Sequence, residues 1–178
     1  MKPHILKIVL VAAGAVAAMT IIFWPKAEAV TVREGQPVGD KIVKSDAEWR
    51  EQLSEQQFRV TRKRDTERPF TGAFWNSHAD GTYACVCCGQ HLFESDNKFD
   101  SGCGWPSFSK EFDTDAITLR EDNSHLMRRV EVVCSRCEAH LGHLFDDGPP
   151  PTGMRFCINS ASLTFIPRKA SGAASTAR

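Results

Sequence analysis

The stretch RRVEVVCSRCEAHLGHLFDDGPPPTGMRFCINSASLTF, residues 128 to 165, carries the clearest structural signals of this 178-residue chain. Its apolar residues form short, partly alternating runs, which are separated by Gly, Pro, Asp and Asn. Such runs predict β-strands rather than helices. Because GTYACVCCG, residues 81 to 89, has the same texture, we expect mainly β structure from about residue 80 onward.

Cys157 lies inside this stretch, in MRFCINS, and strand alternation assigns it a face. One face would hold Met154, Phe156 and Ile158, and the other Arg155, Cys157 and Asn159. Residues two apart on one face are separated by roughly 7 Å, so Arg155 is near enough to favour a thiolate at Cys157. Two interpretations remain open at this point: a small hydrophobe packed in the core, or a reactive thiol.

The segment EAHLGHLFDDGPPPTG, residues 138 to 153, directly precedes that strand. His140 and His143 straddle a glycine, and Asp146 and Asp147 follow. We interpret the segment as a Gly- and Pro-rich loop whose histidines transfer protons near neutral pH. The alternatives are ordinary surface polarity and zinc ligation, and ligation is the weaker because four cysteines already form a metal set.

Those four cysteines form two C-x-x-C pairs, Cys85 with Cys88 and Cys134 with Cys137. Two such pairs can supply four thiolates to one tetrahedral Zn²⁺. Disulfide bonding is the alternative for an exported protein, but the two ends of a tight turn suit disulfide geometry poorly. The spacing therefore predicts one structural zinc. Cys87, inside the first pair, is interpreted as a small buried residue beside the site.

Cys103 lies between two glycines in DSGCGWPSF, residues 100 to 108. The glycines permit unusual backbone angles, so we expect this thiol on a mobile loop. An unpaired exposed thiol is a liability in an oxidising compartment, which argues that Cys103 has a partner. A chance loop cysteine is the alternative.

The segment SDAEWREQLSEQQFRVTRKRD, residues 45 to 65, contains two overlapping capping boxes. In each, a serine and the acid or amide three residues later satisfy free amide groups at a helix start. The pairs are Ser45 with Glu48 and Ser54 with Gln57. They predict two short helices that pack Trp49, Leu53 and Phe58 inward.

The amino terminus has an export pattern. After MKPHILK come 17 uncharged residues, IVLVAAGAVAAMTIIFW, and then an Ala27-x-Ala29 ending. This pattern fits a cleaved signal peptide or an uncleaved membrane anchor, and both place the rest of the chain outside the cytoplasm. We expect a protein of the bacterial periplasm or cell envelope, anchored in the inner membrane if the leader is kept.

The remaining organisation follows from composition. We expect residues 1–29 as the leader, 30–44 as a linker, 45–168 as one domain and 169–178 as a disordered tail. The net charge is zero, and residues 30–178 hold 19 basic and 21 acidic side chains. This balance argues against nucleic-acid binding.

Several motifs together, from RPFTG through LFESDNKFDSGCGWPSF to the stretch quoted first, resemble the B-type methionine sulfoxide reductases. The resemblance runs from about Trp49 to Pro167. It implies a mainly β (α+β) fold with two antiparallel sheets, short amino-terminal helices and one structural zinc away from the active site. A zinc-stabilised binding module without catalysis is the alternative.

The resemblance also implies roles for individual residues. Cys157 matches the nucleophile, which becomes a sulfenic acid, and Cys103 matches the resolving position, which then forms a Cys103–Cys157 disulfide. Trp105 matches the wall against the substrate methyl. The polar residues around the sulfoxide oxygen are matched by His140, His143, Asp147, Arg155 and Asn159. The implied partners are oxidised proteins carrying methionine-R-sulfoxide and a thioredoxin-like reductant, and we expect a monomer.

Overall fold

The structure is a computed structural model that describes residues 39–169. The predicted leader and most of the predicted linker and tail lie outside these residues. Regular structure runs from Asp46 to Pro167, inside the predicted domain. Within the described part of the chain, none of the helices has the length and apolar character that crossing a membrane requires.

Two short helices precede the strands, as the capping boxes predict. Helix α1 spans Asp46–Gln52 and helix α2 spans Glu55–Lys63. Both capping boxes are formed: Ser45 and Ser54 cap the two helices, and Glu48 and Gln57 bond back to the cap amides. Trp49, Leu53 and Phe58 are buried in the core. The prediction for this segment is therefore confirmed.

The strands form two antiparallel sheets, which confirms the predicted fold class. The three-stranded sheet has the order β2-β1-β9, from His91–Glu94, Gly81–Cys85 and Leu163–Pro167. The six-stranded sheet has the order β3-β4-β8-β7-β6-β5. Its strands are Lys98–Phe99, Ser107–Phe108, Arg155–Ile158, His140–Phe145, Arg129–Cys134 and Ile117–Asp122. Short 3-10 turns lie at Ser95–Asn97, Ser124–Leu126 and Ser160–Ser162.

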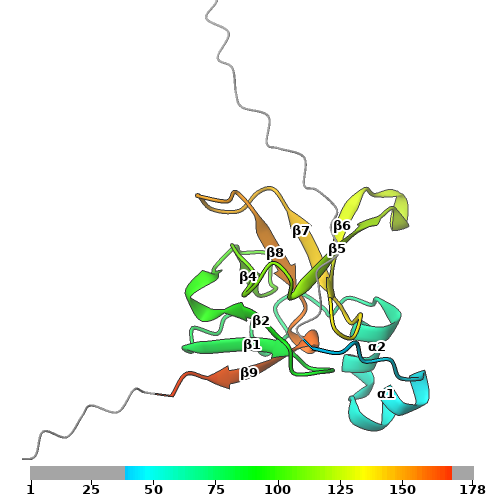
Figure 1. Cartoon of the computed structure of the whole chain (residues 1–178). Helices are drawn as coiled ribbons and strands as arrows, with labels where there is room; N and C mark the ends of the chain where they lie inside the picture. The colour runs from blue at the N-terminus through cyan, green and yellow to red at the C-terminus, as the bar shows by residue number, and fades with distance from the viewer. Residues whose placement is uncertain (1–38, 170–178) are drawn as a thin grey trace, which may run out of the picture.

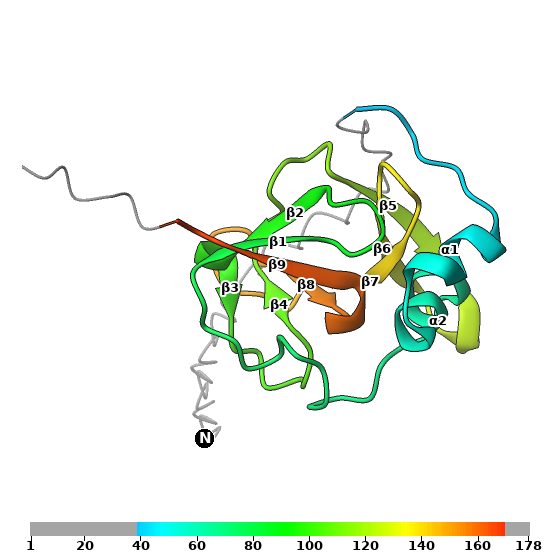
Figure 2. The ribbon, with the colours of Figure 1, turned by 90° about the horizontal axis from the view of Figure 1, so that it is seen from below.

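Figure 1 shows the three-stranded sheet below the six-stranded one, with the helices to one side. In Figure 2 both helices lie at the end of the molecule where β6 and β7 lie, away from β3. Apolar side chains of both sheets and the helices meet in one core cluster, which includes Tyr83, Phe93, Phe108 and Phe156. Burial of such aromatic residues is a main source of stability in a domain of this size.

The two faces of the six-stranded sheet differ in chemistry. The pairs Leu144↔Phe156 and Phe108↔Phe156 lie on the core face. The opposite face carries a row in direct register across four strands: Ser107, Cys157, His143 and Glu131. Residues directly opposite each other in antiparallel strands share a face, so this row brings polar groups to the thiol.

The two histidines lie in strand β7, so the prediction that they lie in a loop is wrong. The run HLGHLF pairs with β6 and β8 on its two sides, and only residues 146–153 form the loop. Gly142 is required in this strand because a Cβ there would lie 2.0 Å from the carbonyl oxygen of Cys157. The glycine that suggested a loop therefore permits close approach of two strands.

Candidate active site and metal centre

Cys157 and Cys103 meet at the centre of the polar face, with their Sγ atoms 3.7 Å apart. Cys157 is in β8, with Ser107 of β4 opposite it on one side and His143 of β7 on the other. Cys103 is in the loop between β3 and β4. Both are free thiols, and both are partly buried. The fold thus brings together two cysteines that are 54 positions apart in sequence.

The loop that carries Cys103 depends on the two glycines that flank it. Gly102 and Gly104 have φ of +69° and +90°, a region that L side chains rarely adopt. A Cβ on Gly104 would also lie 2.9 Å from the backbone nitrogen of Phe70. That nitrogen donates a hydrogen bond to the Gly104 carbonyl at 2.8 Å, which anchors the loop. The unusual backbone angles expected from the sequence are confirmed.

Trp105 follows this loop, and its indole nitrogen donates to the backbone carbonyl of Glu67 at 3.1 Å. Glu67 is itself held tightly, because its carboxylate accepts from the backbone amides of Ser160 and Ala161 at 2.6 and 2.8 Å. The position of the Trp105 ring is therefore fixed by the turn that follows Cys157 and Asn159.

The pKa values of the two thiols are shifted in opposite directions. Burial, the charge of Cys103 and its hydrogen bond together raise the pKa of Cys157 to about 12. Burial also acts to raise the pKa of Cys103, but hydrogen bonds from Ser101 and Ser107 outweigh it, and the pKa of Cys103 is lowered. In the resting dithiol the first negative charge therefore belongs on Cys103.

Arg155 acts on Cys157 in the direction that the sequence suggested, but with less effect than expected. Its charge lowers the pKa of Cys157, yet burial and Cys103 act more strongly. The guanidinium is already engaged, since it binds both carboxylate oxygens of Asp147 at 2.7 and 2.8 Å. Such a paired cation offers a neighbouring thiolate only part of its field.

Both histidines bind a carboxylate of the β5–β6 hairpin. His143 Nε2 lies 2.7 Å from Asp122 Oδ2, and His140 Nδ1 lies 2.7 Å from Glu131 Oε1. A β-bulge at Leu141 makes this possible, because it turns His140 onto the same face as His143. The two imidazole centres are 5.4 Å apart. Asp122 and Glu131 are not among the site residues that the sequence predicts.

Asn159 lies just beyond β8, and both ends of its side-chain amide have partners in the backbone. Its Oδ1 accepts from the amide of Glu67 at 3.1 Å, and its Nδ2 donates to the carbonyl of Leu141 at 3.0 Å. Asn159 thus connects the segment before Trp105 to strand β7.

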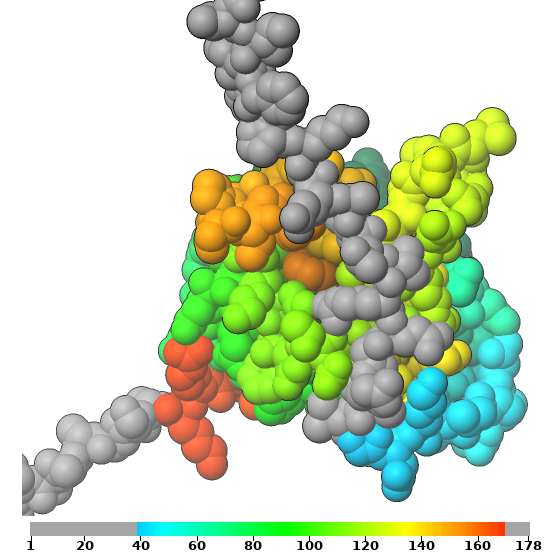
Figure 3. Space-filling model, turned by 45° about the horizontal axis from the view of Figure 1, so that its top comes forward, coloured from blue at the N-terminus to red at the C-terminus, as the bar shows by residue number. Residues whose placement is uncertain are grey.

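A small pocket of about 140 Å³ opens over Cys157. Its volume is below the usual range for whole small-molecule ligands, which suits a single inserted side chain. The lining residues are Thr66, Trp105, Arg129, Gly142, His143, Phe145, Cys157 and Asn159. Of the residues singled out in the sequence, Trp105, His143, Cys157 and Asn159 thus reach one pocket. Cys103, His140, Asp147 and Arg155 are not among the residues that line it. Figure 3 shows the 146–153 loop, in orange, and the β5–β6 hairpin, in yellow-green, projecting from the molecule.

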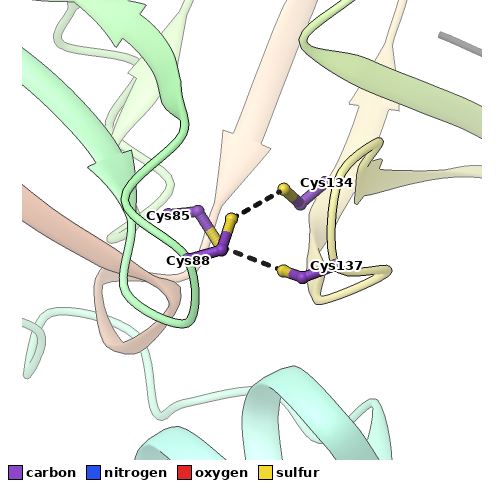
Figure 4. Close-up of side chains that lie close together, drawn as sticks. All are labelled: Cys85, Cys88, Cys134 and Cys137. Carbon is purple, nitrogen blue, oxygen red and sulfur yellow. Dashed lines mark hydrogen bonds between the residues drawn. The ribbon is translucent and has the colours of Figure 1, made fainter. Parts of the chain in front are cut away.

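The four cysteines of the two C-x-x-C pairs converge at a second site (Figure 4). Cys85 and Cys88 come from the end of β1 and its turn, and Cys134 and Cys137 from the end of β6 and its turn. Their sulfur atoms all lie within 4.8 Å of one another, and the pairs Cys85–Cys137 and Cys88–Cys134 are both at 3.6 Å. Tetrahedral zinc with bonds of about 2.3 Å to sulfur requires sulfur atoms roughly 3.8 Å apart. The cluster therefore fits a zinc ion and is not disulfide-bonded. Cys87 is buried in the core cluster and is not one of the four.

Two thiols in contact beside a narrow pocket that His143 lines are suited to thiol-based redox chemistry, which is the class of activity that this geometry indicates. The SelR domain family model matches residues 53–167. A relative from Hahella chejuensis, named peptide methionine sulfoxide reductase MsrB, is 60% identical over 126 residues, which are 71% of this chain and 91% of that protein.

Relatives with the same name from Thiobacillus denitrificans and Acinetobacter baylyi are 56% and 55% identical. These matches cover 70% and 69% of this chain, and 95% and 88% of the relatives. The chain therefore belongs to the SelR-domain family of B-type peptide methionine sulfoxide reductases, and it is an oxidoreductase. The alternative of a binding module without catalysis is set aside.

Proposed function

We propose that this protein reduces the R epimer of methionine sulfoxide in oxidised proteins to methionine. The observation that supports it best is the contact of Cys103 and Cys157 at 3.7 Å beside a pocket of side-chain size. In the first step the Cys157 sulfur attacks the sulfoxide sulfur and takes over its oxygen. Starting from the Cys157 thiolate, one proton is consumed, methionine leaves and Cys157 becomes a sulfenic acid.

The second step joins the two cysteines. The Cys103 sulfur attacks the sulfenic sulfur, a disulfide forms and water leaves. A thioredoxin-like dithiol then exchanges with the disulfide, returning both thiols and becoming oxidised itself. The lowered pKa of Cys103 favours this step, because the thiolate is the attacking species.

Selectivity for one epimer follows from three fixed contacts around the sulfoxide sulfur. Trp105 takes the methyl group, His143 takes the oxygen and Cys157 approaches the sulfur. With these three positions fixed, only one epimer of the sulfoxide can direct its third substituent, the side chain that leads to the peptide, out through the mouth of the pocket. Asn159 also lines the pocket, and Arg155, Asp147 and His140 support this arrangement from outside it.

We propose further that the four-cysteine cluster binds one structural Zn²⁺ through the sulfur atoms of Cys85, Cys88, Cys134 and Cys137. The ion would stabilise the fold and takes no part in the reaction. We also propose that the domain acts outside the cytoplasm, on the basis of the leader pattern in residues 1–29. Mass spectrometry of the mature amino terminus separates a cleaved signal from an anchor.

The epimer assignment is tested by supplying peptide-bound methionine-R-sulfoxide and methionine-S-sulfoxide separately, with dithiothreitol as the reductant. We expect methionine from the R epimer and at least about 100-fold less from the S epimer, which is within the range that a lost or misplaced polar contact produces. Chiral separation of the remaining sulfoxide measures both rates. Consumption of the S epimer alone would contradict the proposal.

The division of labour between the two thiols is tested with Cys103→Ser. Without a reductant, this variant should still release one methionine per chain, because Cys157 is intact. Its Cys157 sulfenic acid should then persist, since the resolving sulfur is missing. Trapping with dimedone followed by mass spectrometry locates the modified cysteine. An unmodified Cys157 after one turnover contradicts the assignment of the nucleophile.

A further inference from the structure

We propose that Asp122 is a positioning residue that holds His143 by its Nε2 atom, so that the Nδ1 atom of His143 serves the substrate pocket. This inference rests on the proposed sulfoxide reduction and adds to it a residue 21 positions before the histidine, on a different strand. It also identifies Nδ1 as the nitrogen of His143 that exchanges the proton. The sequence alone does not reveal which of the two ring nitrogens does so.

The first support is the contact itself. Asp122 is the last residue of β5, and its Oδ2 lies 2.7 Å from His143 Nε2. The two side chains are only 17% and 12% exposed. At this distance a carboxylate, which only accepts, requires the proton of the neutral imidazole to sit on Nε2. Nδ1 then carries the lone pair, and no described residue is hydrogen-bonded to it.

The second support is the set of groups that keep Asp122 charged. Burial acts to raise its pKa, but hydrogen bonds from Ser124 and His143 and the charge of Arg129 hold that pKa well below the usual range. Arg129 Nη2 donates to Oδ2 at 2.6 Å, and the Ser124 amide donates to Oδ1 at 2.9 Å. The carboxylate therefore has fixed partners on both oxygens and cannot easily turn away from the histidine.

The third support is that the β5–β6 hairpin contacts the two histidines through different ring nitrogens. Glu131 binds His140 through Nδ1, whereas Asp122 binds His143 through Nε2. His143 lines the pocket over Cys157, and His140 does not. Only the Asp122–His143 pair thus stands where a leaving oxygen could receive a proton, in the manner of other carboxylate–histidine pairs that fix a tautomer.

The charged and titratable groups around His143 come from every neighbouring strand and from helix α2. Burial lowers the pKa of His143, the bond to Asp122 raises it, and Arg129 and His140 lower it. Facing groups are Asp122 of β5, His125 of the 3-10 turn after it, Arg129 and Glu131 of β6, His140 of β7, Cys157 of β8, Lys63 at the end of α2 and Arg64 just after it. Among these, Asp122 is the group in direct contact that favours the imidazolium.

The test compares Asp122→Asn with the wild type in single turnover, with no reductant present. Loss of the carboxylate lowers the pKa of His143, so the fall in rate with rising pH should begin at lower pH. Near neutral pH we expect a loss of about 100-fold in rate, the lower end of what general acid–base catalysis contributes. Asp122→Glu keeps the carboxylate and should keep the wild-type pH dependence even where its rate is lower.

Glu121→Gln is the matched control, since it removes a charge from the adjacent, exposed residue, which faces the other side of the sheet opposite Val130. It should leave rate and pH dependence unchanged. A nitrogen-15 NMR measurement on the wild type needs no substitution: the neutral His143 ring should carry its proton on Nε2. A proton on Nδ1, or an Asp122→Asn rate and pH dependence like those of the wild type, overturns the positioning role. A wild type that forms no methionine overturns the proposed function instead.

Discussion

Replacing Cys157 by serine is expected to abolish reduction of methionine sulfoxide, with a loss of at least about 10³-fold even in a single turnover. The Sγ atom is the only described sulfur in the lining of the 140 Å³ pocket, so no other thiol can take the oxygen from the substrate there. A serine hydroxyl is far less nucleophilic toward sulfur and cannot form a sulfenic acid or a disulfide. The measurement is methionine released per chain, with and without dithiothreitol.

Cys103→Ser is the matched control, because it removes the partner sulfur 3.7 Å away with the same change of atom. The two variants should differ sharply: one methionine per chain for Cys103→Ser and none for Cys157→Ser. Cys103→Ser should also change the reactivity of Cys157. Without the charge of Cys103, the pKa of Cys157 should fall below about 12, so Cys157 should react faster with iodoacetamide at a given pH. Equal single-turnover yields from both variants contradict the assignment.

Features that depend on neighbouring residues were predictable from the sequence. The capping boxes at Ser45 and Ser54 involve partners only three residues away, and the structure confirms both helices. The alternation around Cys157 likewise gave the correct faces of β8, with Phe156 and Ile158 buried. Each C-x-x-C pair lies in one local turn, so its two cysteines can be predicted as metal ligands before the other pair of the site is known.

Features that depend on register between strands were not predictable from one sequence. Asp122 and Glu131 contact the histidines only because β5, β6 and β7 pair in one particular register. The bulge at Leu141 puts His140 on the same face as His143, which regular strand alternation would not do, and no local sequence feature indicates the bulge. A tightly spaced strand pair explains Gly142, which in isolation indicated a loop. The net pKa of Cys157 also required the position of Cys103, which only the fold supplies.

Loss of the proposed zinc site is expected to reduce the unfolding free energy of the domain by a large amount. Cys85 ends a strand of the three-stranded sheet, and Cys134 ends a strand of the six-stranded sheet. Zinc held by both turns would therefore tie the two sheets together. Structural zinc contributes roughly 10–16 kcal/mol in small zinc-binding peptides. Because the whole unfolding free energy of a domain is about 5–15 kcal/mol, this contribution decides whether the fold persists.

Cys134→Ser should accordingly purify with little zinc and show a lower urea midpoint, or fail to fold. Metal analysis of the wild type should give one zinc per chain. Cys87→Ser is the matched control, since Cys87 is buried between two of the proposed ligands but lies outside the four-sulfur cluster. It should keep its zinc and lose only about 1 kcal/mol, the usual cost of a single substitution. A Cys134→Ser protein with full zinc and an unchanged midpoint would show that the cluster does not hold the ion. Cys157 and Cys103 meet on the polar face of the large sheet, away from the four-cysteine cluster. A partly destabilised variant that still folds should therefore retain the proposed single-turnover step, and this result would separate a structural role of the metal from a chemical one.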